Sequence, residues 1–133
     1  MKTLINIDVP DLGEAINFYC KAFEFKLNRI LDDDVAELTR GGSTIYLLQK
    51  EVGSTCCSHA SGARSYERHW TPLHLDFVVR DLVGSTQRVL AAGATQESEC
   101  VDWRGSKCVS FADPFGHGFC LIQFDGESYS ENE

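Results

Sequence analysis

His74 is the residue of this chain best suited to chemistry, and it heads the segment HLDFVVRDL of residues 74–82. A carboxylate, Asp76, follows two residues later and shares its face if the segment is extended. A histidine with an acidic neighbour can act as a general base near neutral pH, or can be purely structural. Alternate residues of a strand lie roughly 7 Å apart, so Asp76 is expected to tune His74 rather than share a compact metal site with it.

The elements around His74 repeat along the chain. LINIDVPDL, residues 4–12, has the same alternation as residues 74–82, with Leu4 in the place of the histidine. Asp11 is a candidate helix N-cap and Gly93 a candidate left-handed helix end. Apolar periodicity and turn signals predict a strand, a helix and three strands in each half. The expected strands are 3–9, 26–34, 35–40, 43–50, 71–79, 95–103, 106–113 and 118–125, with helices from Leu12 and over 81–94.

The 133 residues suit one domain of two such modules. The first module covers about residues 1–50 and the second about 70–126, followed by a polar tail at 127–133 that is expected to fray. A linker or lid, about 51–69, joins them and contains Cys56, Cys57 and His59. Adjacent cysteines are a poor zinc spacing, and whether this segment reaches His74 is left open.

Composition excludes several classes of partner. A net charge of −8 argues against nucleic acid, which requires a basic surface. No apolar run approaches the roughly 18 residues of a membrane helix, and the first residues lack a signal peptide pattern. The six cysteines are therefore expected to be reduced thiols in the cytoplasm.

Strand alternation separates two faces. One parity is apolar and should pack under the helices: Ile5, Ile7, Val9, Ile45, Leu47, Leu75, Phe77, Val79, Phe119 and Leu121. The other parity mixes apolar and polar groups, as a small-molecule site requires: Asn6, Asp8, Tyr46, Leu48, His74, Asp76, Cys120, Ile122 and Phe124. Aromatic and imidazole rings could add a stacking wall, namely Trp70, Trp103, Phe115 and His117. Cys120 suits a small buried hydrophobe better than a nucleophile.

Three segments, VPDLGEAINFYCKAFEF, HLDFVVRDL and DPFGHGFCLIQF, together with the duplication, resemble the vicinal oxygen chelate superfamily. That superfamily contains glyoxalase I, extradiol dioxygenases, fosfomycin-resistance enzymes and bleomycin-resistance proteins. The resemblance implies an α+β fold of two tandem βαβββ modules whose curved mixed sheet surrounds a cleft. Metal-dependent members place one histidine or glutamate ligand on the first and fourth strands of each module. These positions fall on Leu4, Tyr46, His74 and Cys120.

This ligand set departs from the family pattern, because Leu4 has no donor atom and Tyr46 is a rare ligand. We therefore expect no tightly bound metal. The leading hypothesis is a binding protein akin to the bleomycin-resistance proteins. It would hold a small organic ligand near Asp8 and Asp76, and a cationic aromatic compound is one candidate. The alternatives are a divalent-metal lyase or dioxygenase using His74, and a metal-free enzyme with His74 as base. The resemblance also implies a homodimer.

Overall fold

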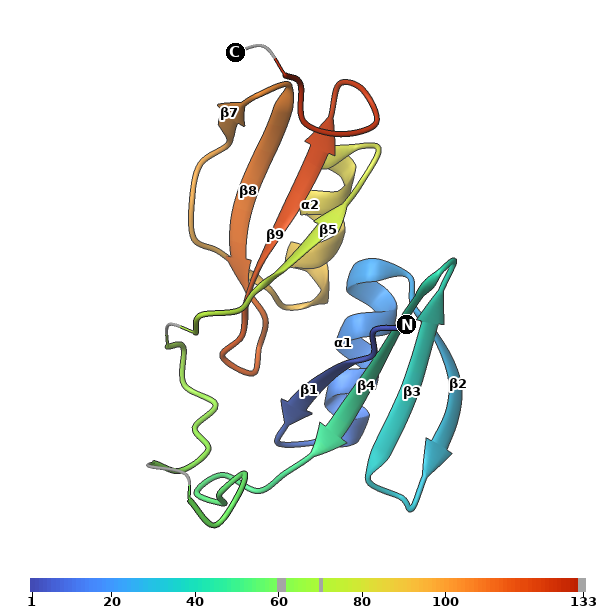
Figure 1. The fold of residues 1–133 in the computed structure, drawn as a ribbon, viewed down its shortest axis with the longest axis vertical. Coiled ribbons are helices and arrows are strands. Elements are labelled where there is room, and N and C mark those ends of the chain that lie inside the picture. The colour runs from blue at the N-terminus through green and yellow to red at the C-terminus, as the bar shows by residue number, and fades with distance from the viewer. Residues whose placement is uncertain (60–61, 70, 132–133) are drawn as a thin grey trace. The chain divides into compact units, whose positions relative to one another are not determined.

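The computed structural model describes residues 1–59, 62–69 and 71–131 (Figure 1). Contacts divide the chain into an N-terminal unit, Met1–Glu67, and a C-terminal unit, Arg68–Glu133. No helix among the described residues is long and apolar enough to span a membrane. Each unit combines one helix with one sheet, so the predicted α+β class is confirmed.

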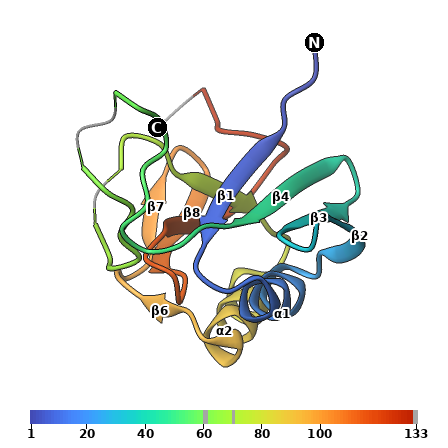
Figure 2. The same cartoon turned by 90° about the horizontal axis from the view of Figure 1, so that it is seen from below.

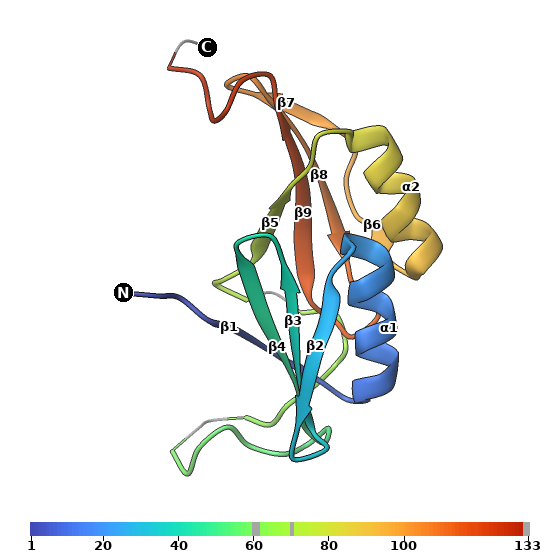
Figure 3. The same cartoon turned by 90° about the vertical axis from the view of Figure 1, so that its right-hand side faces the viewer.

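The N-terminal unit is a four-stranded mixed sheet with a helix on one face (Figure 3). The strand order is β1-β4-β3-β2; β1 and β4 are parallel, and the other neighbours are antiparallel. Phe18 of the helix and the strand residues Ile45 and Leu47 are among its buried side chains. The bounds are β1 Ile5–Val9, α1 Leu12–Phe23, β2 Lys26–Leu31, β3 Val35–Arg40 and β4 Ser43–Gln49.

The C-terminal unit repeats this plan. Its sheet runs β5-β9-β8-β6, with β5 and β9 parallel and β7 also paired to β8. The helix α2 again lies on one face of its own sheet (Figure 3), and Phe119 stacks on Phe111 with ring centroids 5.4 Å apart. The bounds are β5 Leu75–Val78, α2 Leu82–Ala92, β6 Thr95–Gln96, β7 Val101–Trp103, β8 Ser106–Ala112 and β9 Gly118–Phe124.

The duplication extends to the way each helix begins. Asp11 caps α1 by accepting from the Glu14 N–H, and Asp81 caps α2 by accepting from the Gly84 N–H. A glutamine at the end of the last strand accepts from the first helical N–H of its own unit: Gln49 from Leu12 at 2.8 Å and Gln123 from Leu82 at 2.7 Å. These bonds satisfy donors that a helix start leaves unpaired. The predicted caps at Asp11 and Gly93 are confirmed, the latter with φ 120°.

The predicted strand 95–103 is wrong as a single element, because β6 and β7 are separate (Figure 2). The pairing of β6 with β8 ends at Gln96 opposite Phe111, and the pairing of β7 resumes at Val101 opposite Cys108. Four residues, 97–100, therefore face only two residues of β8 and must bulge. The Ser98 hydroxyl replaces part of the ladder by accepting from the Ser110 N–H at 2.9 Å.

The two ends of the segment expected to be a linker are hydrogen-bonded to each other next to the end of β4. Two backbone hydrogen bonds, both of 2.8 Å, join its ends. The Gly53 N–H donates to the Arg64 carbonyl, and the Arg64 N–H donates to the Ser54 carbonyl. The Tyr66 hydroxyl donates to the Lys50 carbonyl at 2.6 Å. These bonds join residues 50–54 to residues 64–66 within the N-terminal unit.

The polar tail is also held, against the expectation that it frays. The Ser130 N–H donates to the Arg104 carbonyl at 2.8 Å. The Tyr129 ring packs edge-on against Phe124, with centroids 4.8 Å apart. The tail is therefore anchored to the end of β9 as far as the chain is described.

Candidate functional site

The two sheet faces differ as the alternation predicts. Six of the ten residues expected on the apolar face are buried, namely Ile7, Val9, Ile45, Leu47, Phe119 and Leu121. The other four, Ile5, Leu75, Phe77 and Val79, are half-buried. On the opposite face His74 and Asp76 are exposed and Cys120 is half-buried. Ile122 is an exception, because it lies on this face yet is only 3% exposed. It packs inside the unit, and its contact with a ligand stays a prediction.

His74, Asp76 and Cys120 come together in the C-terminal unit. His74 directly precedes β5, and Asp76 of β5 lies opposite Cys120 of β9 in the parallel register. His74 Nε2 is 3.3 Å from Asp76 Oδ1, and one donor atom from each of the three residues lies within 4.8 Å of the others. The expectation that strand spacing keeps Asp76 out of a compact group with His74 is wrong, because the side chains lean together. Their exposed fractions are 58% and 39%.

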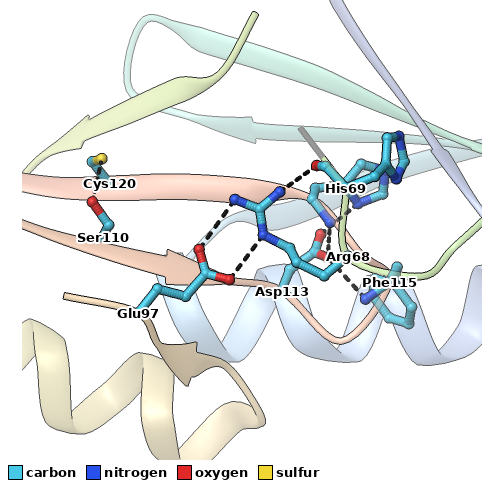
Figure 4. A network of polar contacts seen from close by, with 8 residues as sticks. Arg68, His69, Glu97, Ser110, Asp113, Phe115 and Cys120 are labelled. Carbon is cyan, nitrogen blue, oxygen red and sulfur yellow. Dashed lines mark hydrogen bonds and ion pairs between the residues drawn. The ribbon is translucent and has the colours of Figure 1, made fainter. Parts of the chain in front are cut away.

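A hydroxyl and a second thiol border this cluster. Ser110 is the register partner of Cys120, with 3.4 Å between Oγ and Sγ (Figure 4). Cys108 lies two residues earlier on the same face of β8. Burial, followed by the neighbouring Cys120 and the Asp76 carboxylate, raises the pKa of Cys108 to about 12. Cys108 is therefore a neutral thiol at physiological pH.

Arg68 crosses the start of β9 beside the cluster. Its guanidinium binds the Glu97 carboxylate through two contacts of 2.8 and 3.1 Å and donates to the His69 carbonyl at 2.5 Å (Figure 4). A Cβ on Gly118 would lie 2.4 Å from Arg68 Nη2, so a larger residue there would force the guanidinium to shift. Through these bonds Arg68 attaches the segment that precedes His74 to Glu97.

Two residues proposed for a stacking wall instead build the turn before β9. Asp113 Oδ1 accepts from the backbone N–H groups of Phe115 and His117 at 2.8 and 2.9 Å. Its Oδ2 lies 2.8 Å from His117 Nδ1 (Figure 4 shows the Asp113 contacts). Phe115 is 4% exposed. A buried carboxylate needs such partners, which explains the role of this turn.

Trp103 lies away from the cluster. It pairs with Ser106, which is four residues along β8 from Ser110, a span of roughly 13 Å. Its ring packs edge-on against Tyr129, with centroids 5.2 Å apart, and Arg104 lies over it at 5.5 Å. Trp103 therefore anchors the tail. Trp70, also proposed for the wall, lies outside the described residues.

The corresponding face of the N-terminal unit is occupied by a hydrogen-bond network around Glu37. Tyr46, its register partner, donates a 2.5 Å hydrogen bond to Glu37 Oε2. Asn28 donates to Oε1 at 2.5 Å, and Arg29 Nε lies 3.1 Å from the same oxygen. The bond from Tyr46, then those from Asn28 and Arg29, lower the pKa of Glu37 to about 2, and the same contact raises the pKa of Tyr46. The Tyr46 hydroxyl therefore already donates its hydrogen bond to the Glu37 carboxylate.

The remaining predicted residues of this face offer little free charge. Asn6 is exposed and pairs with Tyr46, and the half-buried Leu48 pairs with Asp8. Asp8 forms an ion pair with Arg64 at 2.7 Å, and the Arg64 side chain is 17% exposed. The negative charge of Asp8 is therefore already neutralised. Nothing in the sequence signals this pair, whose members are 56 residues apart.

The four family metal positions differ between the units: those of the N-terminal unit are poor ligands, whereas those of the C-terminal unit have suitable donor atoms. Leu4 precedes β1 and has no donor atom, and Tyr46 is bound to Glu37. The usual set of histidines and glutamates does not fit this chain. His74 and Cys120 are joined by Asp76, which gives one nitrogen, one oxygen and one sulfur donor in a single unit. Cys56, Cys57 and His59 belong to the other unit, with the two sulfur atoms 3.9 Å apart.

A family model described as a glyoxalase-like domain matches residues 4–122. Two similar relatives are uncharacterised mycobacterial proteins. The one from Mycobacterium bovis is 34% identical over 122 residues, covering 86% of this chain and 78% of its own length. The one from Mycobacterium tuberculosis strain H37Rv has the same identity and covers 69% of its own length.

Solved structures with the same fold include proteins of different activities. One is the fosfomycin resistance protein FosX from Listeria monocytogenes, solved as a mutant with Mn(II) and 1S,2S-dihydroxypropylphosphonic acid. It gives a TM-score of 0.69 at 19% sequence identity, and the match covers 91% of this chain and 87% of that one. Lactoylglutathione lyase from Agrobacterium tumefaciens gives 0.64 at 18%, covering 92% of both. A hypothetical protein from S. aureus gives 0.73 at 22%, covering 92% and 93%. At these identities the likeness concerns the fold.

Proposed function

The chain belongs to the glyoxalase-like family, and from this premise we propose that it binds a small organic molecule on the polar sheet face around His74. The observation that carries the proposal is the exposed His74–Asp76 pair, with 3.3 Å between Nε2 and Oδ1. A carboxylate beside an imidazole orients the ring by accepting from one of its nitrogens. The pair can therefore donate to or accept from a polar group of the ligand.

The surroundings of the pair suit a small-molecule site. Such sites combine apolar surface with a few convergent polar groups. Val78, two residues after Asp76 on β5 and therefore on the same face, is 66% exposed. Cys120 and Ser110 add a thiol and a hydroxyl. Together they offer one titratable ring, one carboxylate, two weaker polar groups and apolar contact.

The charge distribution narrows the ligand class. Asp8 is neutralised by Arg64, and Glu37 by Arg29. A cationic aromatic ligand, which the acidic composition favours, would rely on Asp76. We therefore propose a polar organic ligand recognised through His74, of which a cationic aromatic compound is one candidate.

Calorimetry after a thermal-shift screen tests the proposal. The screen uses cationic aromatics, dicarbonyl–thiol adducts and small phosphonic acids, with chelator present. For the compound that binds, His74→Ala should weaken binding roughly 10- to 100-fold, since a hydrogen bond to a charged group contributes about 1.5–3 kcal/mol. His59→Ala, at an exposed position of the N-terminal unit, is the matched control and should change nothing. Binding that is equal in wild type and His74→Ala would refute the proposed site.

The contact with Asp76 also favours a second candidate function, proton transfer by His74 on the bound molecule. A positioned histidine base typically contributes roughly 100- to 10,000-fold to a rate. Chemical turnover of the bound compound, followed by mass spectrometry, separates this enzyme from a binding protein. Turnover that survives His74→Ala would exclude His74 as the base.

We propose that two copies of the chain pair, as the family resemblance implies. All six residues of β2 are exposed, and Leu27, Ile30 and Leu31 are 37–48% exposed. Exposed apolar residues on an edge strand favour association. Light scattering after size exclusion should give twice the 14.8 kDa of one chain. A mass of one chain at all concentrations would contradict the pairing.

A reducing compartment such as the cytoplasm is the location we propose. All six cysteines are free thiols, and Cys56, Cys57 and Cys100 are exposed. Exposed thiols of this kind persist where glutathione and thioredoxin keep them reduced.

A further inference from the structure

We propose that His74, Asp76 and Cys120 form an exchangeable site for one thiophilic divalent cation such as Zn²⁺, built entirely from the C-terminal unit. This inference rests on the proposed function in using the same sheet face, and it adds a metal to that face. Among the described residues these three form a compact group of possible metal donors. The donor set differs from the family's in having a thiolate, a second residue from the His74 strand segment and no residue from the N-terminal unit.

The geometry is close to that of a bound cation. Zinc lies about 2.0–2.3 Å from nitrogen, oxygen and sulfur ligands, so tetrahedral donors are roughly 3.3–3.8 Å apart. His74 Nε2 and Asp76 Oδ1 are already 3.3 Å apart, and all three donors lie within 4.8 Å of one another. Because the His74 and Asp76 side chains are exposed, a small rotation closes the remaining distance.

Regular strands hold two of the three donors. Asp76 and Cys120 are direct neighbours in the parallel pairing of β5 and β9, and Ser110 contacts the Cys120 sulfur at 3.4 Å. A nitrogen, a carboxylate oxygen and a sulfur favour zinc over magnesium or calcium, which prefer oxygen ligands. Three protein donors leave a fourth position for water or an oxygen of the ligand, as in catalytic zinc sites.

The same features make the site exchangeable. Tight structural zinc sites have four protein ligands and are closed, whereas this group has three and is open to solvent. The protein purified with chelator should therefore be largely metal-free and should take up one equivalent when metal is supplied.

Cobalt(II), a coloured substitute for zinc, tests the site in the full-length chain under reducing conditions. One equivalent should bind with a near-ultraviolet sulfur-to-cobalt charge-transfer band, and Zn²⁺ should displace it. Cys120→Ser should abolish the band while the circular dichroism spectrum is unchanged. His74→Ala and Asp76→Asn should each weaken binding by more than the roughly 10- to 100-fold lost with an outer hydrogen-bonding partner.

The remaining thiols provide the controls. A Cys56→Ser, Cys57→Ser double variant and a Cys108→Ser variant should keep the band and one equivalent of metal. No uptake by wild type, or a band that survives Cys120→Ser or is lost in the double variant, would overturn the inference. Organic ligand binding in the presence of chelator is measured separately. It stands if the metal site fails, and metal uptake without ligand binding would refute the proposed function alone.

Discussion

The polar faces of the two sheets occupy equivalent places in a duplicated fold, yet their chemistry is opposite. In the N-terminal unit the Glu37 carboxylate accepts from Tyr46, Asn28 and Arg29. In the C-terminal unit the Asp76 carboxylate meets an exposed imidazole and lies near a thiol. The first arrangement satisfies a buried charge, and the second leaves groups that can exchange protons or ligands. A duplicated backbone therefore conserves the position of a site but not its chemistry.

The largest effects should come from the cores, where the units are alike. Leu47 of β4 and Leu121 of β9 are both fully buried on the apolar face. Leu47→Ala and Leu121→Ala should each reduce the free energy of unfolding by about 2–5 kcal/mol, because each leaves a cavity. Urea denaturation measures both. A loss below 1 kcal/mol in one variant would break the equivalence of the two cores.

A smaller, pH-dependent effect should distinguish the faces. Because the pKa of Glu37 falls from an ordinary 4.5 to about 2 on folding, its ionised form stabilises the fold above pH 4.5. This contribution is lost as the pH falls towards 2. Glu37→Gln should therefore be less stable than wild type at pH 7, and the difference should vanish between about pH 5 and pH 2. Thermal unfolding at a series of pH values measures it.

Glu24→Gln is the control for that series. Glu24 pairs with Arg40 at 2.9 Å, but both side chains are 51% exposed. Exposed pairs contribute at most about 1 kcal/mol, so this variant should change stability little at any pH. An equal pH response in the two variants would show that the hydrogen bonds around Glu37 stabilise the fold no more than an exposed ion pair does.

The fold was largely predictable because its signals are local. Alternation located most of the strands, and Asp11 and Gly93 marked helix ends. The bulge at residues 97–100 was not predicted, since a hydroxyl of Ser98 interrupts the ladder there. Nor was the anchoring of the polar tail, which depends on contacts of Tyr129 and Ser130. The pairing of Glu37 with Tyr46 could have been found as well, by counting outward from the two-residue turn at Gly41–Gly42.

The grouping of side chains at the candidate site was predictable only in part. Strand parity placed Asp76 and Cys120 on the face of His74. It could not show that the His74 and Asp76 side chains lean together, which depends on side-chain rotation. Nor could it reveal Arg64 beside Asp8 or Tyr129 beside Trp103, because these contacts join segments without a repeating pattern. These two contacts engage Asp8 and Trp103, both of which the sequence predicts as ligand contacts.

The most direct test of the central claim, that the reactive face belongs to the C-terminal unit, is amide NMR during titration with a ligand from the screen. The account predicts chemical-shift changes concentrated around residues 74–78, 108–110 and 118–122. It predicts little change at Arg29, Glu37 and Tyr46. Changes centred on those three residues, with His74 and Cys120 unaffected, would contradict it.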